Sequence, residues 1–393
     1  MPGRRTVGFF LPHFRSGGAE KVVLNWIRYL DRDRYRPMLF LMRCEGRLLD
    51  ALPDDVVPHT LHATRAMALR RPIAAALATH GVSVAYSATN AVNLALLAAR
   101  CPAGTARIIS EHTSPDAYLA EAKLAWLRRR AMQRYYPRAD TVAVPTAAIA
   151  RELRIAVARP LATTVLSNPV VERITPLGPR TRSAPPQIVA AGRLVPAKGF
   201  DILIDACARL KARGVPFRLT LCGEGPLRDQ LAAQIARAGL DESITLAGHC
   251  DPLGRTLAAA DLLISASRRE GFGNVMVEAM AAGTPVLATT TSGATTLIRD
   301  GVNGFLCPPD DAEALAEAIA ALLTDPARAA AVRDEAHATA AGYEAAASTR
   351  GFEALVDRVA DYAAERAARG LNPISTRCVD KTSAVADRGD RAP

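Results

Sequence analysis

Short apolar segments alternate with longer amphipathic segments along most of this chain. In the first half, the apolar segments cover residues 6–11, 36–42, 83–88, 106–111, 141–146 and 163–168. Short apolar runs bounded by turn residues are typical of buried strands, whereas apolar residues three and four positions apart, as in residues 19–30, are typical of helices. Because strands and helices alternate, the pattern predicts a parallel sheet with helices on both faces.

The alternation stops between Asn168 and Pro186, where five prolines interrupt any apolar periodicity. Helices are expected again over residues 201–214 and 227–239, each with a glycine at its end. The chain is therefore predicted to be an α/β protein with two doubly wound, Rossmann-like domains that face each other across a ligand-binding cleft. The strands of the second half are expected from residue 187 onward and in residues 217–223, 243–248, 261–267 and 284–289.

These changes of pattern give the expected domain organisation. An alanine-rich amphipathic helix is expected over residues 344–369, and the polar tail 370–393 lacks periodicity and is predicted to be disordered. The remaining parts would be a first domain over residues 1–170, a linker over 171–186 and a second domain over 187–343.

The cysteines and the hydropathy of the chain indicate the cellular compartment in which the protein is expected. The seven cysteines are an odd number and no two have metal-ligand spacing, which favours buried thiols in a reducing compartment over disulfides or a zinc site. The apolar run after Arg4 and Arg5 is too short for a signal sequence and is interpreted as the first strand. No apolar stretch is long enough to span a bilayer. We expect a cytoplasmic protein, either freely soluble or held peripherally at the inner face of the membrane.

The net charge of +10 is concentrated in the first half of the chain. Residues 1–170 contain 24 Lys and Arg against 12 Asp and Glu. Such an excess suits nucleic acid, an anionic membrane surface or an anionic small molecule. Nucleic acid is disfavoured, because aromatic residues make up only 5% of the chain and no recognition motif occurs.

Two glycine-bearing turns could hold phosphate. Gly17 and Gly18 follow the first predicted strand and begin a helix, where backbone amides can approach an anion. Arg193 and Lys198 lie in AGRLVPAKGF, between the first strand of the second half and its helix. Two cations beside free helix amides suit a diphosphate, although two solvated surface charges are the alternative. Complete P-loop, dinucleotide-binding and hydrolase motifs are absent from the sequence.

A third turn carries two acids. Residues 269–289 read REGFGNVMVEAMAAGTPVLAT, and Asn274 is expected to cap the helix that follows the turn. Glu278 would then lie in the second helical turn, while Glu270 precedes the turn. Carboxylates repel a phosphate but can accept two hydrogen bonds from a vicinal diol. Two acids on either side of a phosphate-binding turn therefore favour a nucleotide sugar as the ligand.

These segments resemble the retaining glycosyltransferases of family 4, which have the GT-B fold. The resemblance rests on EGFGNVMVEAMAAGTPVLAT, AGRLVPAKGFDILIDA and FRSGGAEKVV, and it covers roughly residues 6–360. It implies transfer of a hexose from a UDP- or GDP-sugar to a glycan or lipid-linked acceptor, in cell-surface polysaccharide or glycolipid synthesis, with retention at the anomeric carbon. It also implies that the last helix crosses back to the first domain.

The resemblance also implies roles for individual residues. Glu270 would hold hydroxyls of the donor sugar, and Glu278 would hold those of the ribose. Arg193 and Lys198 would bind the diphosphate. The other implied donor contacts are the Gly17–Gly18 loop, the backbones of Phe272, Gly273 and Asn274, and Gly248 and His249 near the base.

His112 lies in SEHTSP, just past a predicted strand, where the family commonly has a histidine beside the transferred sugar. The alternative is a histidine that merely precedes a capped helix start at Ser114. Its position at a strand end favours the site, because such ends face the cleft. The predicted catalytic set is thus His112, Arg193, Lys198 and Glu270. At Thr296 the chain lacks a glutamate that the family often has, which leaves the donor's identity open.

A basic stripe is expected on a helix between Ser114 and Pro137. Trp126 flanks this stripe, which is typical of a helix at a membrane interface, and the patch could also receive an anionic acceptor. A solvated face with Trp126 packed on a neighbour is equally compatible. The stripe consists of Lys123, Arg130 and Arg134, while Ala125, Met132 and Tyr136 would face the core.

Other functions remain open at this stage. A glycoside hydrolase also uses two carboxylates, but it has no need of a cation clamp at helix starts. A nucleotide-sugar epimerase of the same fold and a non-catalytic nucleotide-sugar-binding subunit would both keep the clamp. No metal is expected, because no acidic pair has metal-ligand spacing.

Overall fold

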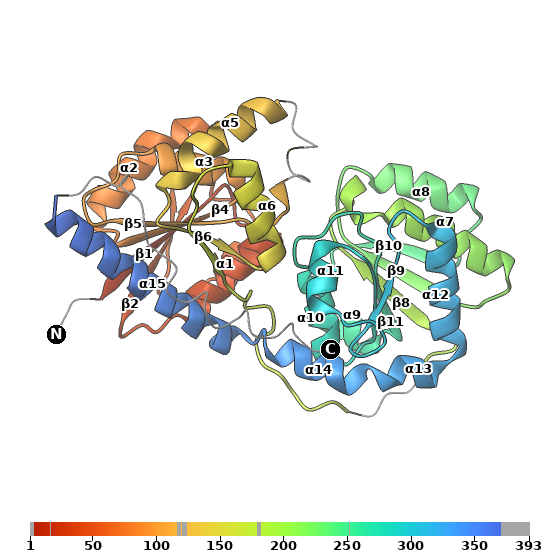
Figure 1. The fold of residues 1–393 in the computed structure, drawn as a ribbon. Helices are drawn as coiled ribbons and strands as arrows, with labels where there is room; N and C mark the ends of the chain where they lie inside the picture. The colour runs from red at the N-terminus through yellow and green to blue at the C-terminus, as the bar shows by residue number, and fades with distance from the viewer. Residues whose placement is uncertain are drawn as a thin grey trace, which may run out of the picture. The chain divides into compact units, whose positions relative to one another are not determined.

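The computed structural model describes residues 4–370 except 16, 116–118, 120–123, 179–181 and 251. The chain divides into two compact units (Figure 1). Unit 1 comprises Met1–Leu166 and Thr349–Pro393, and unit 2 comprises Ser167–Ser348. Each unit contains one parallel sheet, so the predicted α/β class with two doubly wound halves is confirmed. The predicted tail from residue 371 onward lies outside the described residues.

Unit 1 has a seven-stranded sheet in the order β3-β2-β1-β4-β5-β6-β7. All the strand pairs are parallel, and β1 is flanked by β2 and β4. The strand order therefore reverses between β1 and β4, which is where ligands usually bind in doubly wound sheets. The strands are β1 Arg5–Leu11, β2 Tyr35–Leu41, β3 Pro58–Thr60, β4 Val84–Ala88, β5 Ala106–Ser110, β6 Thr141–Val144 and β7 Thr163–Val165.

Helices cover both faces of this sheet. The first face packs against α1 and α15, and the second packs mainly against α2, α3, α5 and α6. The helices are α1 Gly18–Tyr29, α2 Arg70–Thr79, α3 Asn90–Ala98, α5 Ala125–Tyr135, α6 Ala147–Val157 and α15 Ala345–Ala368, with 3-10 turns η1 Arg47–Ala51, η2 Ala66–Leu69 and η3 Tyr136–Arg138.

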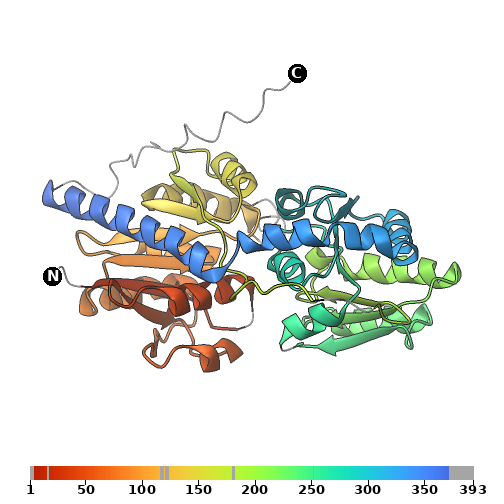
Figure 2. The same ribbon diagram turned by 90° about the horizontal axis from the view of Figure 1, so that it is seen from below.

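Helix α15 completes the core of unit 1, although it is the last helix of the chain. Figures 1 and 2 show it lying along the sheet of this unit. Phe352 stacks on Trp26 of α1 with ring centroids 4.8 Å apart, and both rings are fully buried. Burial of one such side chain is worth about 2 kcal/mol. Near the other end of the helix, Arg366 forms a buried ion pair with Asp140.

Unit 2 repeats the arrangement with a six-stranded parallel sheet in the order β10-β9-β8-β11-β12-β13. The order reverses between β8 and β11. The strands are β8 Gln187–Ala191, β9 Arg218–Cys222, β10 Ile244–Gly248, β11 Leu262–Ser265, β12 Val286–Thr289 and β13 Phe305–Cys307. The helices are α7 Phe200–Ala212, α8 Arg228–Arg237, α9 Leu253–Ala259, α10 Asn274–Ala281, α11 Ser292–Leu297, α12 Ala312–Thr324, α13 Pro326–Ala331 and α14 Arg333–Ala341, with the 3-10 turn η4 Pro196–Lys198.

Two strands were not predicted. β3 and β13 contain only three residues each. Each of them pairs in parallel with a strand that was predicted, β3 with β2 and β13 with β12. Among the residues that the structure describes, no helix combines the length and apolarity of a membrane span.

Candidate functional site

The point where the strand order of unit 2 reverses brings two predicted segments together. β8 leads into the loop with Arg193 and Lys198, and the neighbouring strand β11 leads into the turn with Glu270 and Gly273. Because parallel strands share the direction of their carboxyl ends, both loops emerge at the same edge of the sheet.

Lys198 and Glu270 meet at this edge. The Lys198 ammonium group forms an ion pair with Glu270 Oε2, and Ser267 Oγ donates to the same oxygen at 3.4 Å. The two charged side chains retain 24% and 14% of their exposure, so the pair is partly shielded but still accessible to a ligand. Arg193 is exposed on the same loop, and no carboxylate partner for it occurs within the described part of the chain. The two cations therefore have only one glutamate to balance them among the described residues, and one positive charge is left over for an anionic ligand.

A second ion pair fixes the two loops relative to each other. Arg268, in the loop after β11, donates two hydrogen bonds of 2.8 Å to Asp201 in the first turn of α7. Its backbone amide donates to the carbonyl of Ala197 at 2.9 Å. The guanidinium of Arg268 holds the pKa of the Asp201 carboxyl below its usual range. A bidentate pair of this kind restricts both partners in orientation, so Lys198 is presented on a braced loop.

Helix α10 begins one residue before its predicted start. Gly273 is the N-cap residue and Asn274 is the first helical residue, so the prediction that Asn274 caps the helix is wrong. Gly273 has φ 90°, and a side chain there would collide with Met276. Only glycine fits such a turn without strain. Asn274 instead accepts a hydrogen bond of 3.0 Å from the amide of Asn168.

The remaining residues of the acid-bearing segment have distinct positions. Glu278 lies in the second turn of α10 and is half-buried, and Phe272 is buried in the core with its ring 5.1 Å from that of Tyr343. The amide of Gly293, in α11, donates to the carbonyl of Glu270 at 2.9 Å. Thr296 donates its hydroxyl to the carbonyl of Ser292 at 2.8 Å and is exposed. The segment thus offers backbone amides at a helix start with one acid on each side.

Gly248 is the last residue of β10, and His249 follows it with an exposed side chain. The carbonyl of Gly248 accepts a hydrogen bond of 2.6 Å from the amide of Gly223, which follows β9. These two residues therefore lie at the same edge of the sheet as the loop after β8. Their predicted contact with the base stays a prediction.

A disulfide joins Cys222 and Cys250 beside this loop, with Cα atoms 5.5 Å apart. The prediction that the cysteines are all thiols is therefore wrong. Cys222 ends β9, and Cys250 follows β10 by two residues. Because β9 and β10 are paired, sequence positions 28 apart become neighbours in space. The bond ties the Gly248–His249 loop to the end of β9.

Unit 1 carries its own cluster at the carboxyl ends of its strands. Gly17 is the N-cap residue of α1, and a side chain on it would collide with the carboxylate of Glu20. Glu20 is buried, and its Oε1 lies 3.2 Å from Nδ1 of His13. Gly18 is exposed and begins the helix. The carboxylate of Glu20 therefore fills the space beside Gly17, and a larger residue at this position would require Glu20 to move.

His112 follows β5 in the same unit. Its Nε2 lies 2.9 Å from the hydroxyl of Ser110. The ring keeps some contact with solvent, yet burial lowers the pKa of His112 to about 4, an effect that the carboxylate of Glu20 opposes. The imidazole is therefore neutral at neutral pH and can both donate and accept a hydrogen bond.

A buried polar network behind His112 was missed in the sequence. Glu111 accepts a hydrogen bond of 2.9 Å from the amide of Asn93 and another from the hydroxyl of Tyr136. Asn90 donates to the Tyr136 hydroxyl at 2.7 Å, and Ser87 donates to Asn93 at 2.7 Å. Burial raises the pKa of Glu111 to about 7, while its hydrogen bonds oppose that rise. The one feature of the sequence that could have revealed this network is Glu111, a charged residue at the end of an apolar strand.

Thr89 is a second residue that the sequence did not reveal. It caps α3 at the end of β4, where the strand order reverses, and its φ is 91°. A β-branched residue rarely adopts positive φ, at a cost of order 1–3 kcal/mol. Its hydroxyl is buried and has no hydrogen-bond partner among the described residues. Strain and an unused hydroxyl at this point in the sheet mark Thr89 as a candidate ligand contact.

The basic stripe is only partly within the described residues, because Lys123 lies outside them. Trp126 of α5 is 62% exposed, and Leu124 and Leu127 beside it are 53% and 48% exposed, so the Trp126 ring is not buried against a neighbouring element. The guanidinium of Arg130 lies 5.9 Å from the centre of the Trp126 ring. Arg134 is exposed, while Met132 and Tyr136 are buried as predicted.

The described residues contain no group of three His, Cys, Asp or Glu side chains arranged to hold a metal ion. Whether the reaction needs a metal stays a prediction. The cluster in unit 2 provides two cations, the backbone amides at the start of α10 and two carboxylates. The cluster in unit 1 provides a neutral histidine and a loop with two glycines.

Comparison with known proteins gives two matching family profiles. Residues 16–173 match the profile described as Glycosyltransferase Family 4, and residues 179–339 match the one described as Glycosyl transferases group 1. The chain is 39% identical over 140 residues to the lipopolysaccharide core biosynthesis glycosyltransferase LpsE of Rhizobium meliloti strain 1021, a match that covers 36% of this chain and 40% of that protein. The chain thus spans about two fifths of the length of this relative in the match.

Solved structures share the fold over nearly the whole chain. The HepE protein of Anabaena in complex with UDP-glucose aligns with 90% of this chain and 99% of its own, at a TM-score of 0.74 and 24% identity. Sucrose-phosphate synthase of Thermosynechococcus elongatus aligns with 91% of this chain and 100% of its own, at a TM-score of 0.77 and 20% identity. At these identities the likeness shows the fold alone, and that fold is GT-B, as expected from the sequence.

Proposed function

Because this chain belongs to the group 1 glycosyltransferases of family 4, we propose that it transfers a hexose from a UDP- or GDP-sugar to a glycan or lipid-linked acceptor. The relatives named above include a glycosyltransferase of lipopolysaccharide core biosynthesis, and the HepE structure contains UDP-glucose. The first supports a role in the synthesis of a cell-surface polysaccharide or glycolipid, and the second supports a nucleotide-sugar donor.

The observation that carries the proposal is the meeting of Lys198 and Glu270 where the strand order of unit 2 reverses. A diphosphate needs cations, and a sugar needs hydrogen-bond acceptors for its hydroxyls. In this proposal the diphosphate lies on Arg193, Lys198 and the amides at the start of α10. Glu270 then accepts hydrogen bonds from the sugar hydroxyls and holds Lys198 in place before the donor arrives.

The other donor contacts extend from this centre. Glu278, one turn into α10, would hold the two ribose hydroxyls. The backbones of Phe272, Gly273 and Asn274 would face the sugar and phosphates. Gly248 and His249 would border the base, on the loop that the Cys222–Cys250 disulfide ties to β9. The amides of the Gly17–Gly18 loop would approach the donor phosphate.

In the proposed reaction the bond between the anomeric carbon and the diphosphate oxygen breaks, and the acceptor oxygen bonds to the same face of that carbon. The acceptor's proton passes to the departing diphosphate. Arg193, Lys198 and the α10 amides stabilise the charge that develops on the leaving group, which is commonly worth several kcal/mol of barrier. Neutral His112 would donate to or accept from a sugar hydroxyl without adding charge.

The acceptor side of the proposal uses the exposed end of α5. Trp126 with Leu124 and Leu127 gives an apolar tip, and Arg130 and Arg134 lie beside it. An apolar tip flanked by cations suits the surface of an anionic membrane, where a lipid-linked acceptor would be presented. We place the enzyme at the inner face of that membrane, held peripherally.

A transfer assay tests the proposal. The full chain is incubated with radiolabelled UDP- and GDP-hexoses and an extract of lipid-linked and free glycans, and labelled product is measured with its anomeric configuration. We expect transfer with retention, and we expect Lys198→Ala to lower turnover by roughly a hundredfold or more. The matched control is Lys211→Ala, an exposed lysine of the same unit.

The same assay separates the alternatives. Change of the donor hexose in the absence of any acceptor would identify an epimerase. Donor binding without transfer or epimerisation would identify a non-catalytic binding subunit. Either result would replace the transferase proposal.

A further inference from the structure

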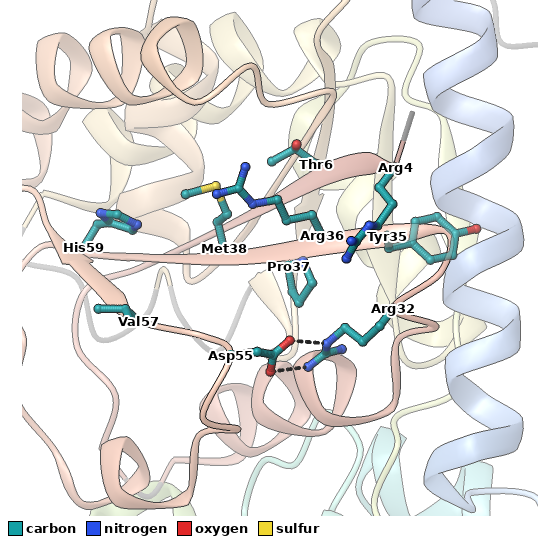
Figure 3. A pocket seen from close by; sticks show the side chains of 10 residues that line it. All are labelled: Arg4, Thr6, Arg32, Tyr35, Arg36, Pro37, Met38, Asp55, Val57 and His59. Carbon is teal, nitrogen blue, oxygen red and sulfur yellow. Dashed lines mark hydrogen bonds and ion pairs between the residues drawn. The ribbon is translucent and has the colours of Figure 1, made fainter. Parts of the chain in front are cut away.

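A hollow opens beside the amino-terminal half of β2, away from the strand ends that carry Gly17 and His112. β3 pairs only with Leu39–Leu41, so within the described part of the chain residues 35–38 of β2 have no strand on that side. Pro37 lies in this uncovered stretch, as proline usually does at a sheet edge. The hollow has a volume of about 600 Å³ and is lined by residues of β1, β2 and β3 and of the adjoining loops (Figure 3).

The lining is strongly cationic. Arg4, Arg32 and Arg36 face the hollow together with a single carboxylate, that of Asp55. Asp55 is already engaged, because it accepts hydrogen bonds of 2.6 Å and 3.2 Å from Arg32, a pair visible in Figure 3. That pair holds the pKa of the Asp55 carboxyl below its usual range. The positive charge of the other two arginines is left without compensation in the hollow.

Two neighbouring arginines at the same end of the sheet are compensated, in contrast to Arg4 and Arg36. Arg5 and Arg34 lie at the same end of the sheet, and both pair with Asp357 of α15. Arg4 and Arg36 have no carboxylate partner among the residues that the structure describes. The fold thus neutralises Arg5 and Arg34, which face α15, whereas only Arg32 of the three arginines that line the hollow has a carboxylate partner.

The hollow also has an apolar side. Thr6 and Arg36 are partners in the parallel register of β1 and β2, so they share a face with Met38, two residues further along. Pro37 and Val57 complete the apolar lining, and Val57 is 70% exposed. A site of this composition suits a ligand with one anionic end and one apolar part.

We propose that this hollow, the Arg4–Arg36 site, binds a phosphate ester whose phosphate lies between Arg4 and Arg36 and whose apolar portion rests on Met38 and Val57. Arginine guanidinium groups match phosphate oxygens in a bidentate geometry, and such bonds are stronger than neutral ones. His59 closes one end of the hollow. Burial lowers its pKa, and His80 and Arg36 add to this effect, so the ring stays neutral and adds a hydrogen-bonding group without further charge.

The Arg4–Arg36 site is separate from the donor site of unit 2, and calorimetry with pyrophosphate distinguishes the two. The full chain at low salt should bind two pyrophosphate ions. Arg4→Ala/Arg36→Ala should lose one of them, with affinity lowered at least tenfold, and Arg193→Ala/Lys198→Ala should lose the other. Arg100→Ala, an exposed arginine elsewhere in unit 1, is the matched control and should keep both.

The single variant Arg36→Gln keeps the test informative if the double variant folds poorly. Unchanged binding in Arg36→Gln, or an equal loss in Arg100→Ala, would overturn the proposal. The apolar contact is tested with phenyl phosphate, which should bind more tightly than inorganic phosphate to the natural chain but not to Val57→Ser. Equal binding of the two ligands to the natural chain would overturn that part.

The phosphate could belong to a soluble ester or to a lipid headgroup, and flotation with vesicles of 70% phosphatidylcholine and 30% phosphatidylglycerol separates these sources. Unchanged flotation of Arg4→Ala/Arg36→Ala would assign a soluble ester. Loss of both flotation and pyrophosphate binding would assign a headgroup. Loss of flotation with intact pyrophosphate binding would contradict a phosphate site here.

Discussion

Lys198 and Glu270 form an ion pair across 72 positions of sequence, at the edge where β8 and β11 end side by side. A second ion pair, between Arg268 and Asp201, also joins these two loops. The pair of Lys198 and Glu270 is explained as preparation for a ligand with a phosphate for the lysine and hydroxyls for the glutamate. The predictions below test this account and its surroundings.

Glu278→Gln should weaken the binding of a free nucleoside diphosphate. The glutamine keeps one acceptor oxygen, so it should lose one charge-assisted hydrogen bond to the ribose, worth about 1.5–3 kcal/mol, and bind roughly ten- to a hundredfold less tightly. Titration calorimetry measures the change. Glu317→Gln on the exposed side of α12 is the matched control. Equal affinities of Glu278→Gln and the natural chain would contradict the ribose assignment.

Glu111→Gln should change how stability depends on pH. The pKa of Glu111 is raised from 4.5 to about 7, so its stabilising protonated form is fully present below pH 4.5 and is lost as the pH rises through about 7. Thermal unfolding should therefore show the variant gaining stability relative to the natural chain between about pH 5 and 8. A constant difference across this range would show that Glu111 stays ionised.

The pKa of His112 is shifted in the opposite direction from that of Glu111, so the effects of the two groups on stability have to be measured separately. The pKa of His112 is lowered from 6.5 to about 4, so the stability of the folded chain falls as the pH drops from 6.5 towards 4. In His112→Gln this acid-side loss should be smaller, while the change near pH 7 that depends on Glu111 should persist. Loss of both effects in the one variant would mean that the two groups titrate as a unit.

Unit 2 shows most clearly which features could be predicted from the sequence and which could not. Strand periodicity placed the loops of Arg193 and Glu270 at strand ends, but only the order β10-β9-β8-β11 explains why they meet. The Cys222–Cys250 bond was missed for the same reason, since the spacing of cysteines along the chain does not reveal which strands are neighbours. The Glu111 network was missed because its members lie on separate elements of unit 1, and each of them alone is an ordinary polar residue.

Reduction of the Cys222–Cys250 disulfide should lower the stability of unit 2. Closing a loop of 28 residues stabilises a fold by about 3.5 kcal/mol in the chain-entropy view, and Cys222→Ala should lose a similar amount. Unfolding is followed with and without reductant, and thiols are counted in both states. Cys44→Ala, which removes an exposed free cysteine, is the control. No difference in thiol count would show that the bond does not form in solution.

Charge reversal on α5 should release the protein from anionic membranes. Arg130→Glu/Arg134→Glu removes two cations beside Trp126, and each cation near such a surface contributes about 1 kcal/mol. Sedimentation with phosphatidylglycerol vesicles should show binding lowered more than tenfold. Arg100→Glu/Arg159→Glu, exposed elsewhere in unit 1, controls for net charge. An equal effect of both pairs would indicate unspecific attraction.

The most direct test of the account is calorimetric titration of UDP and GDP into the natural chain and into Arg193→Ala/Lys198→Ala. We predict that one of the two nucleotides has one tight site on the natural chain and that the variant binds it at least a hundredfold more weakly at this site, while the thermal unfolding of the variant is unchanged. Binding of equal strength to both proteins would contradict the central claim, because the diphosphate would then lie somewhere other than the loop after β8.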